Sequence, residues 1–220
     1  MERRVDEEMK QLKDRLLTMA GKAEQAVGTA VKALVDRNPA LAETVIREDV
    51  GINQLEVQIE DACLTFLARY QPEAKDLRFV AMVFKIVNDL ERVGDQAVNI
   101  SERTLDLLKE PLLKPLIDLP TMAQLAQQML KDALDAFVRQ DAELARAVCR
   151  RDDEVDHLND QVYQDLLVYM TRDANTITRA VDLILIGRHL ERVADHATNI
   201  AEDVFYLVHG TTIKHRLAGE

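Results

Sequence analysis

The feature of this sequence that most restricts its fold is an internal repeat. The stretch DLERVGDQAVNISE begins at Asp89, and HLERVADHATNIAE begins 100 positions later, at His189. Earlier segments of the two halves align at an offset of 103, and the matched pairs include Leu41 with Leu144, Val45 with Val148, and Asp49 with Asp152. Two copies of one unit are expected to fold alike, so the repeat limits the fold to two similar modules.

The spacing of prolines and apolar residues predicts that both copies are helical. All five prolines lie between long segments in which apolar residues recur at steps of three and four, as in Leu183, Ile186 and Leu190. Asn38, which precedes a proline, and Asp141 are typical helix N-caps. We therefore predict an all-α protein with helices at about 3–36, 39–70, 75–109, 120–139, 142–171 and 175–209.

Three of these helices belong to each copy of the repeat. Three amphipathic helices bury their apolar stripes most simply by packing against one another as a bundle. The proline-containing stretch KEPLLKPLIDLP lies between the two copies. We expect a first three-helix repeat at 1–110, a second three-helix repeat at 118–210 and a C-terminal tail at 211–220.

The net negative charge of the chain limits the classes of molecule that it is expected to bind. Its formal net charge is −11, whereas a protein that binds DNA or RNA usually carries a basic surface for the phosphates. The same charge counts against direct binding of phosphate and favours metal cations or basic protein surfaces. The charged N-terminus contains no signal peptide, and no apolar run is long enough to span a bilayer, so we expect a cytoplasmic protein.

Motifs for catalysis are missing from the sequence. It contains no phosphate-binding glycine-rich loop and no recognisable pair of nucleophile and base, so we expect a protein that is not an enzyme. Gly94 is matched by Ala194 in the second copy, which argues against a phosphate cradle there. Cys63 and Cys149 are the only cysteines, and we interpret both as small buried apolar residues.

Acidic side chains recur at the same positions of the third and sixth predicted helices. On a helical wheel with Glu191 at zero, Asp195 lies at about 40° and Glu202 at about 20°, while the apolar stripe lies roughly 160° away. Glu91 and Asp95 repeat this arrangement in the first copy. Charged side chains opposite the core commonly form only a solvent-exposed helix face. Such a face needs charge, but it does not need the same acids at the same positions in both copies.

The preceding helix of each copy adds further oxygen atoms. Asp49 and Asn53 in the first copy correspond to Asp152 and Asp156 in the second, and they flank the apolar stripe. Converging carboxylates repel one another unless a cation lies between them, and an all-oxygen site suits Mg²⁺, Mn²⁺, Ca²⁺ or iron. We therefore predict one metal-binding patch per copy, with the candidate ligands Glu91, Asp95, Glu191, Asp195, Asp49, Asn53, Asp152 and Asp156.

Histidines gather in the second copy only. His157, His189 and His196 stand where the first copy has glutamine or aspartate. His189 and His196 are seven residues apart on one helix face, so that half could also take Zn²⁺ or iron. The alternative is that all three are partly exposed helix residues without a metal.

The two repeated segments resemble a known family. QPEAKDLRFVAMVFKIVNDLERVGDQAVNISER and HLERVADHATNIAEDVFYLVHG resemble the signature regions of the PhoU family, and the resemblance covers essentially the whole chain. It implies two three-helix bundles related by pseudo-twofold symmetry, with metal ions at surfaces formed by Glu91 and Asp95 and by Glu191 and Asp195. Asn53 in place of an acid, and His189 in place of one, are departures that leave the metal (Mg, Mn, Fe or Zn) open.

The resemblance also implies a role in the cell. Members of the family are negative regulators of the phosphate-starvation response, act in the cytoplasm, and are thought to link the ATPase subunit of the high-affinity phosphate ABC transporter to a sensor histidine kinase. The resemblance and the frequency of closed symmetric dimers both favour a homodimer.

Two other functions are compatible with parts of the sequence. A structural helical-repeat spacer would use its acidic stripes only for solubility. A ferritin-like di-metal protein would need two Glu-x-x-His pairs, and the chain has only Glu154 with His157.

Overall fold

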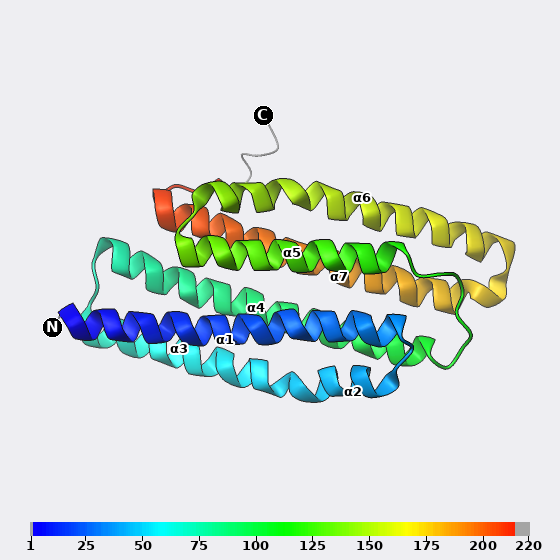
Figure 1. The fold of residues 1–220 in the computed structure, drawn as a ribbon, viewed down its shortest axis with the longest axis horizontal. Coiled ribbons are helices and arrows are strands. Elements are labelled where there is room, and N and C mark those ends of the chain that lie inside the picture. Colours follow the sequence, from blue (N-terminus) through cyan, green and yellow to red (C-terminus); the bar gives the residue numbers. More distant parts are fainter. Residues whose placement is uncertain (1, 214–220) are drawn as a thin grey trace.

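The computed structural model describes residues 2–213, with side chains from residue 4 onward. Figure 1 shows a bundle of long helices, and the described residues contain no β-strand. The predicted all-α fold is therefore confirmed. The helices are α1 (Glu2–Val35), α2 (Pro39–Glu48), α3 (Val50–Tyr70), α4 (Ala74–Leu107), α5 (Asp118–Arg139), α6 (Ala142–Arg172) and α7 (Ile177–His209), with a 3₁₀ turn at Ala174–Thr176.

Local capping explains where several helices begin. The side chain of Asn38 accepts hydrogen bonds from the backbone N–H groups of Ala40 and Leu41, and a proline occupies the first position of α2. Asp141 accepts in the same way at the start of α6. These side chains satisfy backbone donors that have no partner within the helix. Both N-caps predicted from the sequence are confirmed.

The predicted single helix at 39–70 is wrong in one respect, because the structure divides it at Asp49. The backbone N–H of Ile52 donates to the carbonyl of Asp49 at 2.8 Å, a three-residue spacing that tightens the helix locally. The equivalent helix of the second copy, α6, is continuous. The interruption places Asp49 at the junction of α2 and α3, beside α4.

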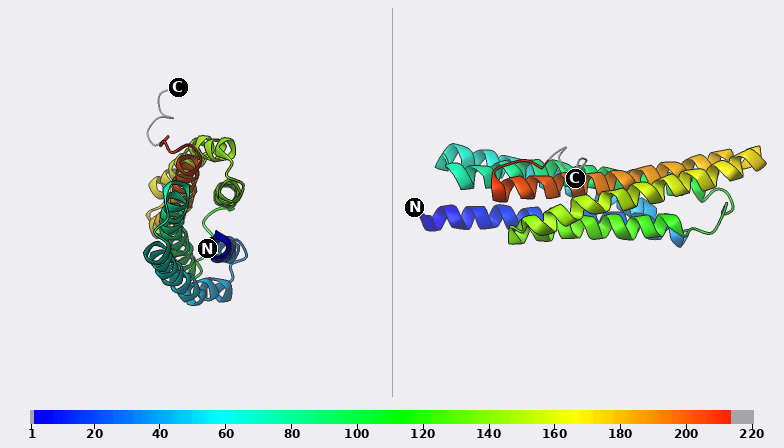
Figure 2. Two further views of the ribbon diagram at one scale, coloured as in Figure 1. Left: turned by 90° about the vertical axis from the view of Figure 1, so that its left-hand side faces the viewer. Right: turned by 90° about the horizontal axis from the view of Figure 1, so that it is seen from above.

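Each copy of the repeat forms one three-helix layer of the molecule. α1, α4 and the α2–α3 pair contact one another, and α5, α6 and α7 do the same, so the two three-helix bundles are confirmed. The bundles join mainly through α4 and α7, with α1 also contacting α5. Figure 2 shows the resulting elongated shape from the end and from above. One contiguous core runs through both bundles and includes Leu90, Phe137 and Leu190.

Two equivalent polar contacts join α4 to α7, one on each side of the boundary between the repeats. Asp89 of the first copy contacts Nδ1 of His196 at 2.9 Å. His189, the counterpart of Asp89, contacts Gln96, the counterpart of His196, also at 2.9 Å. This exchange is what a pseudo-twofold axis between α4 and α7 produces. Among the described helices, none is long and apolar enough to cross a membrane.

Candidate functional site

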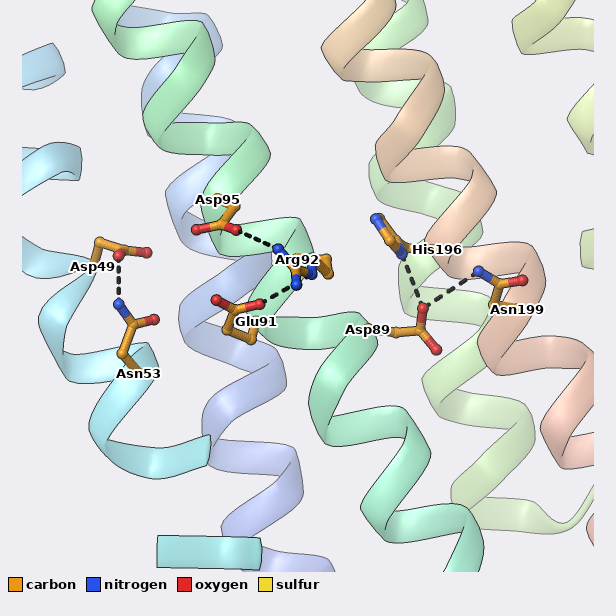
Figure 3. Close-up of polar contacts among 8 residues, drawn as sticks. All are labelled: Asp49, Asn53, Asp89, Glu91, Arg92, Asp95, His196 and Asn199. Carbon is orange, nitrogen blue, oxygen red and sulfur yellow. Dashed lines mark hydrogen bonds and ion pairs between the residues drawn. The ribbon is translucent and has the colours of Figure 1, made fainter. Parts of the chain in front are cut away.

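The first acidic cluster lies where the α2–α3 junction faces α4. Figure 3 shows Asp49 and Asn53 on one side and Glu91 and Asp95 on the other. The Asn53 amide donates to Oδ2 of Asp49 at 2.9 Å. Oδ1 of Asp49 and Oδ1 of Asn53 are buried and accept no hydrogen bond from any described residue. Buried oxygen atoms without a donor are unfavourable, so this junction presents two atoms that a cation would satisfy.

The carboxylates of this cluster act on one another. Burial, followed by the negative charges of Asp95 and Glu56, raises the pKa of Glu91. The pKa of Asp49 is also raised, chiefly by burial and further by Asp95, although its hydrogen bond from Asn53 opposes the shift. These mutual effects place the acids of α3 and α4 in one electrostatic field. Asp49 and Glu91 thus act on each other across the junction, and Asp95 raises the pKa of both.

An arginine neutralises part of this charge. Arg92 Nε lies 3.5 Å from Glu91 Oε2, and its Nη1 lies 3.2 Å from Asp95 Oδ2. In Figure 3 its guanidinium is turned toward both acids. The side chain of Arg92 is 54% exposed, so these surface ion pairs are weak and open to competition.

Glycine at position 94 allows the two helices to approach closely. A Cβ atom there would lie 3.1 Å from Oδ1 of Asp49 and 3.1 Å from Cδ1 of Ile52. Both distances are shorter than ordinary van der Waals contact. The close approach of α4 to the α2–α3 junction therefore depends on the missing side chain, a role that the sequence did not reveal.

The second acidic cluster has the same plan on α6 and α7. Burial, then Asp195 and Asp156, raises the pKa of Asp152 to about 6, while the nearby Thr198 hydroxyl opposes the shift. Oδ1 of Asp152 is buried and has no hydrogen-bond partner within residues 2–213. Burial also raises the pKa of Glu191, with smaller raising contributions from Asp156 and Asp195. The four acids predicted for this half therefore share one electrostatic field.

The second cluster differs from the first in the arginine and amide side chains that bind its acids. Arg188 Nη1 donates to both carboxylate oxygens of Glu191, at 2.9 and 2.7 Å. The Asn159 amide donates to Glu191 Oε2 at 3.0 Å. Arg188 stands three residues before Glu191, whereas Arg92 follows Glu91 directly, so the two halves use different arginines. Neither arginine was predicted from the sequence as a partner of these acids.

The side chains do not form a ready-made metal site. Within the part of the chain that the structure describes, no three Asp, Glu, His or Cys side chains are arranged to hold a metal ion. The donor chemistry nevertheless fits a hard cation, because both clusters combine carboxylates with buried, unsatisfied oxygens. A cation would have to displace Arg92 from Glu91 and Asp95, and Arg188 from Glu191.

The three histidines contact side chains other than the predicted ligands. His189 and His196 contact Gln96 and Asp89 across the boundary between the repeats. His157 is exposed on α6 and contacts Gln161 at 3.0 Å.

Comparisons with known proteins agree with this architecture. A family profile described as the PhoU domain matches residues 16–104 and 119–204. The chain is 42% identical over 209 residues to a phosphate-specific transport system accessory protein PhoU homolog of Aquifex aeolicus, covering 95% of each chain. It is also similar to two solved structures. One is PhoU from Pseudomonas aeruginosa, with a TM-score of 0.91, 40% identity and coverage of 94% of this chain and 99% of the other.

The second similar structure is the phosphate transport system regulatory protein PhoU from Streptococcus pneumoniae. Its TM-score is 0.88 at 31% identity, with coverage of 94% of this chain and 98% of the other. The similarity thus extends over both repeats and over nearly the full length of each of these proteins.

Proposed function

This chain belongs to the PhoU family, and from that premise we propose that it is a cytoplasmic regulator that restrains the phosphate-starvation response. A role in the regulation of phosphate transport follows from the family itself. The observation that carries the finer proposal is the match of both repeats, across almost the whole length, to proteins named as accessory and regulatory components of phosphate transport.

The partners in this proposal are two proteins of the same signalling route. One is the ATPase subunit of the high-affinity phosphate ABC transporter, and the other is a sensor histidine kinase. An adapter needs rigid surfaces, and the continuous core through both bundles supports such rigidity. A homodimer, in which each partner protein meets an equivalent surface, is part of the same proposal.

Metal binding is the second part of the proposed function. Asp49, Asn53, Glu91 and Asp95 would hold a cation in the first repeat. Asp152, Asp156, Glu191 and Asp195 would do so in the second. A bound divalent or trivalent ion would supply positive charge that relieves the repulsion among buried carboxylates and ties adjacent helices together. The unsatisfied oxygens of Asp49, Asn53 and Asp152 support this assignment.

A genetic test addresses the regulatory role. In a host lacking its own PhoU, a phosphate-starvation reporter is active in high phosphate. Expression of this chain is expected to silence the reporter. A chain lacking Glu91, Asp95, Glu191 and Asp195 tests whether the acidic clusters contribute.

The comparison needs matched protein levels, measured by immunoblot. A reporter that stays active with well-expressed wild-type chain, while a PhoU from the host silences it, contradicts the regulatory proposal. A reporter silenced equally by the wild-type and the four-acid variant retains the regulatory role but contradicts a need for the metal clusters.

A further inference from the structure

A cavity opens at the boundary of the two repeats, between α4 and α7, and Asp195 of the second acidic cluster lies on its wall. Its volume is about 500 Å³. Arg92 and Gln96 of α4 line it together with Arg192, Asp195 and His196 of α7. Positions 92 and 192 correspond in the repeat, as do 96 and 196. The pseudo-twofold arrangement therefore brings both copies of one arginine to the same cavity.

The cavity has more positive than negative groups on its wall. Two guanidinium groups line it, against the single carboxylate of Asp195. Arg92 is shared with Glu91 and Asp95, but no hydrogen bond or ion pair joins Arg192 to another described side chain. A guanidinium offers paired N–H donors that match the oxygens of a phosphate group. Both arginines are exposed at the cavity, so their donors are accessible to an anion from solvent.

A buried amide adds a neutral donor to the wall. Gln96 is only 6% exposed, so its position is fixed by packing. Its Oε1 can only accept, and it takes the Nδ1 hydrogen of His189 at 2.9 Å. This contact leaves the amide N–H groups of Gln96 available to a ligand in the cavity.

The local field differs from the charge of the whole chain. The net charge of −11 disfavours anions at long range. At the cavity itself, however, the guanidinium groups of Arg92 and Arg192 outnumber the one lining carboxylate, Asp195. The local balance of charged side chains is therefore positive, although that of the whole chain is negative.

We propose that the cavity between α4 and α7 binds a phosphate group, with Arg192 and Arg92 as the charged ligands and Gln96 as a neutral donor. The phosphate belongs either to free inorganic phosphate or to the end of a nucleotide. This inference goes beyond the proposed function, since it requires neither a metal ion nor a partner protein.

Equilibrium dialysis tests the site directly, with chelator-treated protein in low-salt buffer and either radiolabelled inorganic phosphate or ATP without magnesium. Saturable binding of one ligand per chain is expected. Arg192→Gln should weaken it at least tenfold, and Gln96→Leu should weaken it several-fold. Arg192→Lys, which keeps the charge but loses the paired donors, should fall between wild type and Arg192→Gln.

Arg139→Gln is the matched control, because it removes the same charge at the exposed end of α5 and should change binding less than twofold. Circular dichroism melts identify any variant that fails to fold, and Arg192→Lys then replaces it in the comparison. Saturation by inorganic phosphate identifies the free anion as the ligand, and saturation by ATP alone identifies a nucleotide. Non-saturable uptake of both ligands, or equal affinities of Arg192→Gln and Arg139→Gln, overturns the proposal.

Discussion

Asp152 of α6 lies in the electrostatic field of Asp195 on α7, with its Oδ1 atom buried and unpartnered among the described residues. Burial, Asp195 and Asp156 raise its pKa to about 6, against about 3.9 for an unfolded aspartate. The folded state therefore binds this proton more tightly than the unfolded state. It follows that the free energy of unfolding falls as the pH rises from about 4 to about 6.

Replacing the Asp152 carboxylate by an amide should remove the free-energy cost of ionising this buried group. In chelator-containing buffer, we expect Asp152→Asn to raise the free energy of unfolding at pH 7.5 by about 1–2 kcal/mol, after allowance for solvent screening. The advantage should shrink toward pH 4.5. Urea denaturation at both pH values measures it, with Asp153→Asn on the exposed side of α6 as control. A lower stability of Asp152→Asn at pH 7.5 would contradict this assignment.

The contact of Gly94 with Asp49 makes a second prediction. Alanine in place of a helical glycine usually stabilises by about 1 kcal/mol. Gly21, which has open space around it, should show this full gain as Gly21→Ala. Gly94→Ala should gain clearly less or lose stability, because Asp49 and Ile52 must move away from the new methyl group. Equal gains for the two variants in urea denaturation would show that the approach of α4 is not tight.

Asp89 joins the two repeats through two donors. It contacts Nδ1 of His196 at 2.9 Å and accepts from the Asn199 amide at 3.3 Å. Removing the carboxylate in Asp89→Ala leaves both groups without this acceptor and should cost about 1–3 kcal/mol. Asp89→Asn, which keeps one acceptor oxygen, should cost less. Asp61→Ala, at an exposed acid, is the control, and an equal loss in Asp61→Ala and Asp89→Ala would refute a joining role.

The two cysteines should resist modification in the folded protein. Burial and then Glu60 raise the pKa of Cys63 to about 11, and burial followed by Glu202 raises that of Cys149 to about 12. At pH 8 roughly one Cys63 thiol in a thousand is then ionised, and the thiolate is the reactive form. An aromatic disulfide reagent should label neither residue quickly until urea is added. Rapid labelling of native protein would contradict the packing around them.

The sequence predicted the fold closely because its strongest signals are local. Proline positions and apolar steps of three and four set the helices, and the repeat set their grouping. The division at Asp49 was missed because no proline marks it and the residue keeps helical dihedral angles, φ −56° and ψ −34°. Cys63 is fully buried as expected, whereas Cys149 is only partly so.

The candidate site was predictable only in part. Helical register was enough to place Glu91 and Asp95 on one face of their helix, and Asp49 and Asn53 on one face of theirs. The pairing of Arg188 with Glu191 was not predicted, since it depends on which rotamer a long side chain adopts. The contact of His196 with Asp89 depends on how the two repeats pack, and helical spacing within one repeat carries no such information.

Metal titration of each half separately tests the central claim, that each repeat binds a cation through its own acids. Isothermal calorimetry with Mn²⁺ and chelator-treated protein should reveal two sites in the wild type. Glu91→Ala/Asp95→Ala and Glu191→Ala/Asp195→Ala should each lose one site. Glu102→Ala/Asp106→Ala, which removes two exposed acids of α4, should keep both. No saturable binding by the wild type, or two sites retained in both ligand variants, would contradict the claim.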